Sequence, residues 1–152
     1  MLNIRLRKCA ETHHVFLGNF EFPREFECGC GCGMCDIDLE VWLCCQLIRQ
    51  RFNTPVIIRS GCRCESHNRD VGGAEDSDHR FGWAADLVVT GVPSPKVAEF
   101  AQMLPDAKRI GVYEPGGRNG REGFVHIGVR DRGPNKWKRW RYDSQQRPVH
   151  AR

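Results

Sequence analysis

The sequence has no long apolar run. Its 152 residues contain no stretch that approaches the roughly 18–20 apolar residues of a membrane-spanning helix. Charges interrupt the first twenty residues, which leaves no apolar core of the kind that a secretory signal peptide requires. We therefore expect a protein that is made in the cytoplasm without a signal peptide and that has no membrane partner.

Neither sign of charge dominates the sequence, because Lys and Arg total 23 and Asp and Glu total 19, a net charge of +4. So small an excess favours anionic surroundings without demonstrating a nucleic-acid partner, which we do not expect. Internal repeats and low-complexity tracts are absent from the sequence. With 40% hydrophobic residues, a chain of this length predicts one compact domain, which we expect to be monomeric and to carry one site.

The apolar residues recur at both helix and strand spacings. A first helix of about 15 residues is predicted to begin at Asp36 or Asp38, and a second has Ser94 as its cap and Pro95 in its first turn. Residues 61–80 are expected to form a long polar loop. Four strands are predicted, at residues 56–60, 83–89, 109–113 and 124–130. The fold class is therefore α+β, with a mainly antiparallel sheet and helices packed on one face.

We divide this single domain into three segments. Residues 1–35 form a cysteine-rich N-terminal arm that is expected on the surface, residues 36–130 form the core, and residues 131–152 form a basic, aromatic C-terminal tail. The tail either contacts an anionic polymer or folds back so that its tryptophans cover the sheet.

Two histidines and an aspartate form the constellation that carries chemistry. His79 lies in the polar loop, Asp86 in the second strand and His126 in the last strand. Because side chains alternate along a strand, Asp86 faces away from Leu87, and His126 faces away from Val125. Each residue alone also fits an ordinary structural role. Together they make the three-ligand set of a catalytic zinc site with its fourth position open to water, although such a set accepts other divalent ions.

A resemblance to a known family rests on the pattern Ser77-x-His79-x-x-Gly82-x-Ala84-x-Asp86, followed downstream by Phe124-Val125-His126. This pattern resembles the zinc D-Ala-D-Ala carboxypeptidase family, including its phage-endolysin branch. Two upstream runs resemble the Ser-Gly-x-Arg loop and the Asn-x-x-x-Gly-Gly run of that branch; they are Ile58-Arg59-Ser60-Gly61-Cys62-Arg63 and Asn68 with Gly72-Gly73. The resemblance covers roughly residues 20 to 130.

The resemblance implies a fold shared with the Hedgehog signalling domain and the D,D-peptidases. It implies one Zn2+ ion bound by His79, Asp86 and His126, and hydrolysis of peptide bonds in the stem peptides or cross-bridges of peptidoglycan. The reaction would be of carboxypeptidase or endopeptidase type. A phage or prophage lysin of this kind would act on the cell wall after release from the cell or delivery by a phage particle.

The resemblance suggests Arg63 as a catalytic residue, and Glu122 is a further candidate. Arg63 would bind a substrate carboxylate or carbonyl through its guanidinium fork, the alternative being a solvated loop arginine. Relatives often carry an acidic residue three positions before the final zinc histidine, where this chain has Gly123. Glu122 lies one residue further away and has the same parity as His126 along an extended strand, so it could face the attacking water unless a bulge intervenes. It is the candidate general base, with Glu114 in reserve and a solvent-exposed surface glutamate as the alternative.

A second departure lies two positions after His126, where relatives commonly have aspartate and this chain has Gly128. The sequence therefore does not identify the residue that hydrogen-bonds to His126 and orients its ring. Gly123 and Gly128 together motivate an alternative function, a catalytically inactive zinc-binding structural or cell-wall-binding module of the same fold.

Nine cysteines are an odd number, so complete pairing within the chain is impossible. Cys44 and Cys45 are interpreted as small packing residues of the first helix. The run of Cys28, Cys30, Cys32 and Cys35 is too tightly spaced for a standard paired zinc knuckle, although Cys9, Cys44, Cys45, Cys62 or Cys64 could complete a site with it. The alternatives to such a second, cysteine-bound ion are reduced thiols and disulfides formed after release, and the sequence favours these alternatives.

Overall fold

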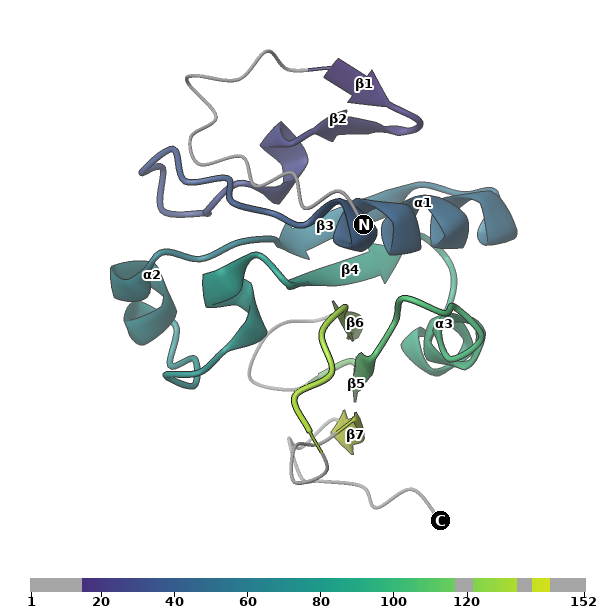
Figure 1. Cartoon of the computed structure of the whole chain (residues 1–152). Coiled ribbons are helices and arrows are strands. Elements are labelled where there is room, and N and C mark those ends of the chain that lie inside the picture. The colour runs from purple at the N-terminus through teal and green to yellow at the C-terminus, as the bar shows by residue number, and fades with distance from the viewer. Residues whose placement is uncertain (1–14, 117–121, 134–137, 143–152) are drawn as a thin grey trace.

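A five-stranded sheet runs through the centre of the protein (Figure 1), in a computed structural model that describes residues 15–116, 122–133 and 138–142. The order of its strands is β3 (Val56–Ser60), β4 (Ala84–Val89), β6 (Phe124–Gly128), β5 (Arg109–Tyr113) and β7 (Arg139–Tyr142). Neighbours are antiparallel, except that β5 and β7 run parallel. The predicted α+β class with a mainly antiparallel sheet is confirmed. The last predicted strand ends two residues early, at Gly128.

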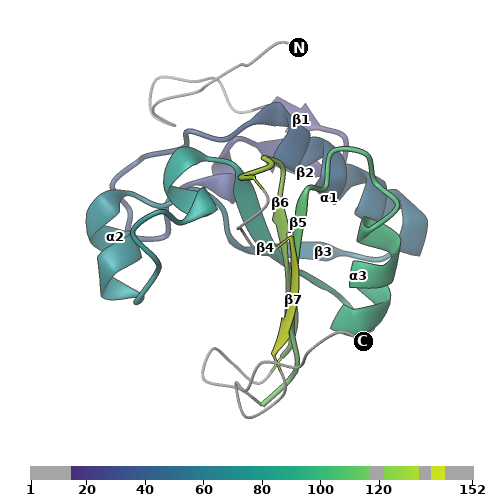
Figure 2. The same ribbon diagram turned by 60° about the horizontal axis from the view of Figure 1, so that its bottom comes forward.

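Helices α1 (Leu39–Phe52) and α3 (Ser94–Ala101) cover one face of the sheet, as predicted (Figure 2). On the opposite side lie α2 (Glu65–Asp70) and the 3₁₀ helix η3 (Asp78–Phe81), both within or next to the stretch expected to be a polar loop. Among the described residues, no helix combines the length and apolarity that crossing a bilayer requires.

The cap of α3 differs from the sequence prediction by one position. Pro93 precedes the helix and Ser94 is its first residue, and the Ser94 hydroxyl donates to the Tyr113 carbonyl at 3.1 Å instead of capping the helix. The Ser94 side chain therefore ties α3 to β5. At α1, Asp38 is the residue before the first turn, as predicted, but its carboxylate pairs with Arg130 and makes no capping hydrogen bond.

The core lies between α1, α3 and the sheet. The inward-facing strand residues predicted by alternation are all buried there, and they are Ala85, Leu87, Val89, Val125, Ile127 and Val129. Val41, Cys45 and Ile48 of α1 pack against them and are fully buried, and Cys44 is buried beside them. Each buried aliphatic side chain of this size contributes about 1.5–3 kcal/mol to the stability of the fold. These side chains therefore determine which face of the sheet packs against the helices, and the opposite face is available for a site.

The described part of the N-terminal segment, residues 15–35, packs aromatic side chains into the core, although the sequence prediction places the segment on the surface. A hairpin of β1 (Val15–Leu17) and β2 (Phe20–Phe22) leads into a 3₁₀ turn, and Phe20, Phe22 and Phe26 are buried in the core. Their rings contact one another, with centroids 5.8 and 6.0 Å from Phe26. Three large aromatic rings outweigh the turn-forming cysteine and glycine residues that suggested an exposed arm. The division into three segments stays a prediction, and residues 1–14 lie outside the described part.

The described part of the C-terminal segment joins the sheet as its edge strand β7. Trp140 of this strand lies against the sheet, as one of the two expected arrangements requires. Lys136, Trp137 and residues 143–152 lie outside the described residues.

Gly82 joins η3 to the approach of β4 in a conformation that other residues rarely adopt. Its φ is +70°, and a Cβ atom there would lie 1.9 Å from the carbonyl oxygen of Asp36. We expect Gly82→Ala to destabilise the fold by more than the ~1–3 kcal/mol of left-handed strain alone, measured by urea unfolding.

Gly91 provides the matched control for Gly82→Ala. Its φ is +73°, but nothing lies within 4 Å of its Cβ position. Gly91→Ala should show only the left-handed strain, about 1–3 kcal/mol. Equal losses in the two variants would contradict the close approach at Gly82.

Candidate metal centre

One row of residues crosses the open face of the sheet. In the strand register Ser60 lies opposite Asp86, Asp86 opposite His126, His126 opposite Gly111, and Gly111 opposite Trp140. Cross-strand partners point to the same face, so this row faces away from the core. Figure 2 shows that this face looks toward α2 and η3, and η3 brings His79 to the same place.

Three side-chain donor atoms converge on this row. His79 Nε2 lies 3.2 Å from Asp86 Oδ1 and 3.2 Å from His126 Nδ1, and His126 Nδ1 lies 2.9 Å from Asp86 Oδ1. Bonds of about 2.0–2.1 Å in a tetrahedral zinc site place neighbouring ligand atoms about 3.3 Å apart. The three separations are close to that value, so the structure brings together the predicted ligands in a geometry that suits one divalent ion.

The hydrogen bond of His79 leaves its Nε2 to face the other two donor atoms. His79 Nδ1 lies 2.6 Å from the Gly61 carbonyl oxygen, which can only accept, so Nδ1 carries the proton. In the neutral ring, Nε2 then presents a lone pair toward an oxygen of Asp86, which also only accepts. Two buried acceptors at 3.2 Å repel unless a proton or a metal ion lies between them, and a metal ion would satisfy both.

Asp78 supports the far side of the His126 ring. Its buried carboxylate lies 3.9 Å from His126 Nε2, an ion-pair distance, while Arg109 Nε and Arg132 Nη1 hold it at 2.8 and 3.0 Å. Gly128 leaves the space for this arrangement, because a Cβ there would lie 3.1 Å from Asp78 Oδ2. A carboxylate thus approaches His126 although the position two residues after it is glycine.

The charges of this cluster stabilise one another. Burial by itself raises the pKa of the Asp86 carboxyl and lowers that of His126. The histidines outweigh burial at Asp86, whose pKa falls well below its usual range, and the nearby carboxylates of Asp78 and Asp86 raise the pKa of His126. At Asp78, burial is likewise outweighed by His126 and Arg109, which lower the pKa. Both carboxylates are therefore ionised at neutral pH and able to neutralise a bound cation.

Arg63 contacts the candidate ligand Asp86 directly. Its Nη2 donates to Asp86 Oδ2 at 3.1 Å and its Nε to the Ser60 hydroxyl at 2.9 Å, and the side chain is largely buried. Asp86 Oδ1 is therefore left to face the histidines. Arg63 lines the cleft, and its guanidinium contacts a candidate ligand instead of standing as a solvated loop arginine. Its role as a clamp for the substrate stays a prediction.

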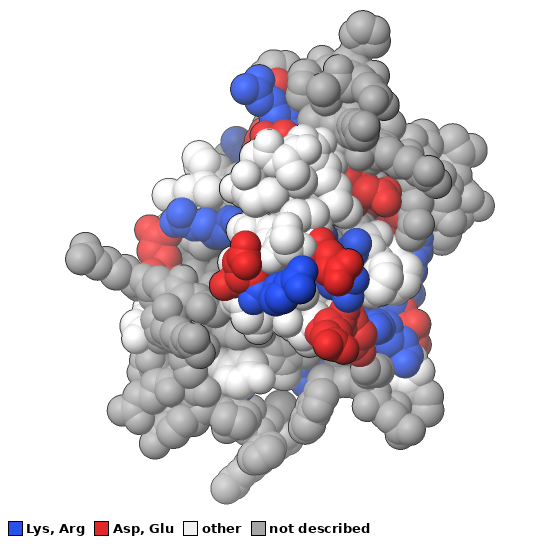
Figure 3. Space-filling model, turned by 90° about the vertical axis from the view of Figure 1, so that its left-hand side faces the viewer, with Lys and Arg blue, Asp and Glu red and all other residues white. Residues whose placement is uncertain are grey.

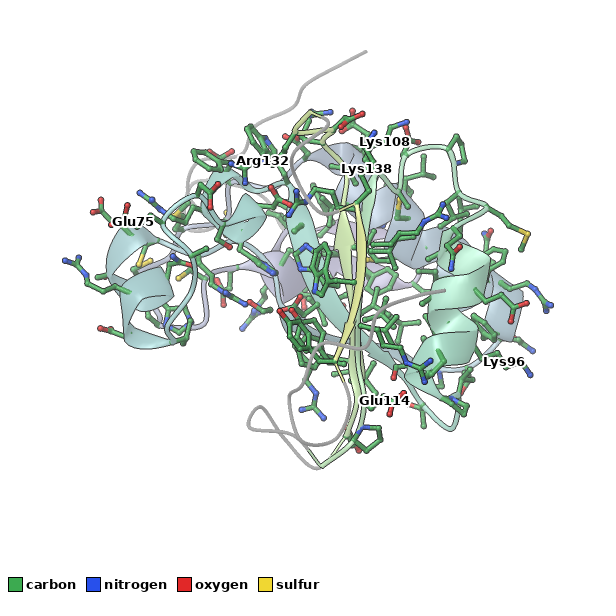
Figure 4. All side chains as sticks on the ribbon, turned by 90° about the horizontal axis from the view of Figure 1, so that it is seen from below. Glu75, Lys96, Lys108, Glu114, Arg132 and Lys138 are labelled. Atoms are coloured by element: carbon green, nitrogen blue, oxygen red, sulfur yellow. The ribbon has the colours of Figure 1, made fainter. Side chains whose placement is uncertain are left out.

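Glu122 and Glu114, the two candidate bases, lie in different places. Glu122 lines the cleft, is well exposed and pairs with Arg59 at 2.5 Å. Glu114 pairs with Arg141 and lies at the end of the sheet away from Arg132 (Figure 4), outside the lining of the cleft. The assignment of Glu122 as the general base stays a prediction.

A cleft of about 1090 Å³ opens above the three donor atoms. Trp140 forms part of its floor, because Gly111 has no side chain and the indole fills that space, with its ring centroid 5.1 Å from that of His126. The Trp140 Nε1 donates to the Tyr113 hydroxyl at 2.9 Å, and Tyr113 stacks between Phe124 and Tyr142. The cleft therefore has polar donors at one end and an aromatic wall at the other.

Sequence reasoning missed Asp78, Arg109, Arg132 and Trp140. Asp78 is the neighbour of His79 in the sequence motif, and this adjacency was the one available signal for it. The two arginines and the tryptophan gave no signal, since they reach the site only through strand pairing and a long-range ion pair.

The comparisons with known proteins agree with this geometry. A search of curated proteins finds no match. A protein-family model described as Peptidase M15 matches residues 20–128, well over half of the chain, and that range contains all three residues of the proposed metal centre. The chain therefore belongs to the peptidase M15 family and carries a metallopeptidase domain of that family.

Proposed function

We propose that the protein is a zinc-dependent peptidase that hydrolyses peptide bonds in bacterial peptidoglycan. The observation that carries this proposal is the convergence of His79 Nε2, Asp86 Oδ1 and His126 Nδ1 within 3.2 Å of one another, in the floor of a cleft. Three protein ligands leave one coordination position open, as in catalytic rather than structural zinc sites. Family membership supplies the reaction class, and peptidoglycan stem peptides are the proposed substrate.

Each group in the cleft has a place in the proposed reaction. Zinc, when bound, supplies a Lewis acid that lowers the pKa of water to about 7 and polarises a carbonyl. Arg63 and Asp78 orient Asp86 and His126, and the Trp140 indole covers one side of the centre so that water does not reach it from there. The aromatic wall of Tyr113, Phe124 and Tyr142 offers apolar surface to the substrate.

Glu122→Gln tests the proposed base. The variant keeps the shape of the side chain but cannot take a proton, so we expect kcat/KM to fall by ~10²–10⁴-fold with bound metal unchanged. Glu114→Gln is the matched comparison, because Glu114 is also a glutamate paired with an arginine but lies outside the cleft lining. A loss in Glu114→Gln instead would reassign the base, and no loss in either variant would remove this role from both residues.

Digestion of purified peptidoglycan tests the function itself. The full-length protein is incubated with peptidoglycan or a synthetic stem peptide, with zinc or with a chelator, and new amino termini are counted. We expect release with zinc and none with the chelator, and the mass of the products identifies a carboxypeptidase or an endopeptidase. Bound zinc without cleavage would favour the alternative of an inactive zinc-binding or wall-binding module.

The described face over α2 gives no support to nucleic-acid binding. On the face over α2, acidic and basic side chains lie side by side and do not gather into a patch of one sign (Figure 3). Synthesis in the cytoplasm followed by release or phage delivery to the wall remains part of our proposal, as does the lysin role.

A further inference from the structure

Four cysteines outside the peptidase centre gather at one point. Cys28, Cys30 and Cys32 lie in the loop between the 3₁₀ turn at Arg24–Phe26 and α1, and Cys64 is the residue immediately before α2. Their sulfur atoms all lie within 4.8 Å of one another. Figures 1 and 2 show the two segments side by side at the end of the molecule that α2 occupies.

The sulfur separations suit a metal ion better than a disulfide. Cys28 Sγ lies 3.5 Å from Cys30 Sγ, which lies 3.7 Å from Cys64 Sγ. Four thiolates at about 2.3 Å from a tetrahedral zinc ion are about 3.8 Å from one another. A disulfide needs sulfurs about 2.05 Å apart, and all four cysteines are free thiols in this structure.

Packing explains the burial of Cys28 but not the positions of Cys30, Cys32 and Cys64. Cys35, Cys44, Cys45 and Cys62 are buried like ordinary small apolar residues, but Cys30 and Cys32 are exposed and Cys64 is half-buried. Exposed thiols add nothing to the core, yet in this loop they turn toward Cys28 and Cys64. Their convergence therefore calls for a ligand.

Backbone N–H groups donate to two of the four sulfur atoms. The N–H of Cys64 donates to Cys28 Sγ at 3.3 Å, and the N–H of His67 donates to Cys64 Sγ at 3.4 Å. Such bonds favour the ionised thiol and orient a metal ligand. The glycines that alternate with the cysteines allow the loop to turn, since Gly31 and Gly33 have φ of +80° and +79°.

We propose that Cys28, Cys30, Cys32 and Cys64 form a second metal site, a closed four-thiolate site for structural zinc. Four protein ligands leave no position for water, so the site stabilises the fold and takes no part in hydrolysis. It fastens the N-terminal loop to the connection between β3 and α2. The next residue before Cys64 is Arg63, which holds Asp86, so the structural site also fixes a positioning residue of the peptidase centre.

Metal counting on the untagged, full-length protein tests the proposal. We expect about two zinc ions per chain in the unaltered protein and about one in Cys30→Ser/Cys32→Ser. This variant should stay folded with lowered stability, because both side chains are exposed and lie outside the core. His126→Ala should also retain about one. In His126→Ala loaded with cobalt(II), the remaining ion should show intense thiolate-to-cobalt charge transfer, which the double serine variant should lack.

Cys44→Ala is the matched control, because it removes a cysteine outside the cluster and should leave two ions bound. One ion in the unaltered protein with no thiolate band would overturn the proposal. So would a mass, under denaturing non-reducing conditions, that shows a disulfide among the four cysteines of freshly purified protein. Failure of peptidoglycan digestion would leave these readouts unchanged, so the two proposals fail separately.

Discussion

His126→Ala is expected to abolish peptide hydrolysis, with a loss on the order of a thousandfold or more. The imidazole contributes one of three donor atoms at 2.9–3.2 Å, and two ligands do not hold a zinc ion in an open tetrahedral geometry. The residual rate should equal that of the unaltered protein treated with chelator. Release of amino termini from a stem peptide measures both.

Circular dichroism and added zinc together distinguish the loss of a metal ligand from a folding defect. Far-ultraviolet circular dichroism should show that His126→Ala is folded, because the residue faces the cleft and not the core. Activity should not return at high zinc concentration. A folded His126→Ala variant that retains near-normal, chelator-sensitive activity would contradict the assignment of His126 as a ligand.

Asp78→Asn is expected to weaken zinc binding at the peptidase centre by ~10–100-fold, the usual effect of losing a carboxylate behind a metal-bound histidine. It should also lower the free energy of unfolding by about 3 kcal/mol, because Arg109 and Arg132 lose a buried anionic partner. Competition with a zinc chelator measures the affinity of the peptidase centre, and urea unfolding of the metal-free protein measures the stability.

Asp76→Asn is the matched control for Asp78→Asn. Asp76 pairs with the same Arg132 at 3.2 Å, but its side chain is 49% exposed. Surface pairs of this kind contribute about 0–1 kcal/mol, so stability should change little and zinc affinity should not change. Equal effects in the two variants would show that the support of His126 does not come from Asp78.

Strand alternation predicted the side of the sheet on which the centre lies. Asp86 and His126 each lie between apolar neighbours that had to face the core, so their own direction followed from the period of two. The register between strands could not be predicted from the sequence, since no local signal places Asp86 opposite His126 or Trp140 opposite Gly111. The proposed ligands were therefore predictable, but the tryptophan beside them was not.

Short and non-local features account for the other differences. The six-residue helix α2 is too brief for a helical period to emerge from a polar stretch. Asp78 approaches His126 only because η3 lies over Gly128, a contact between segments far apart in the chain. Phe20, Phe22 and Phe26 are buried in the core. The turn-forming residues around them in the sequence indicated an exposed segment, so their burial was not predicted.

Anomalous scattering at the zinc edge, from a crystal grown with zinc, tests the central claim most directly. The account predicts an ion at about 2.0–2.2 Å from His79 Nε2, Asp86 Oδ1 and His126 Nδ1, with a solvent molecule as its fourth ligand. Rings of His79 and His126 that point apart, no ion at this place, or a fourth protein ligand that closes the site would contradict it.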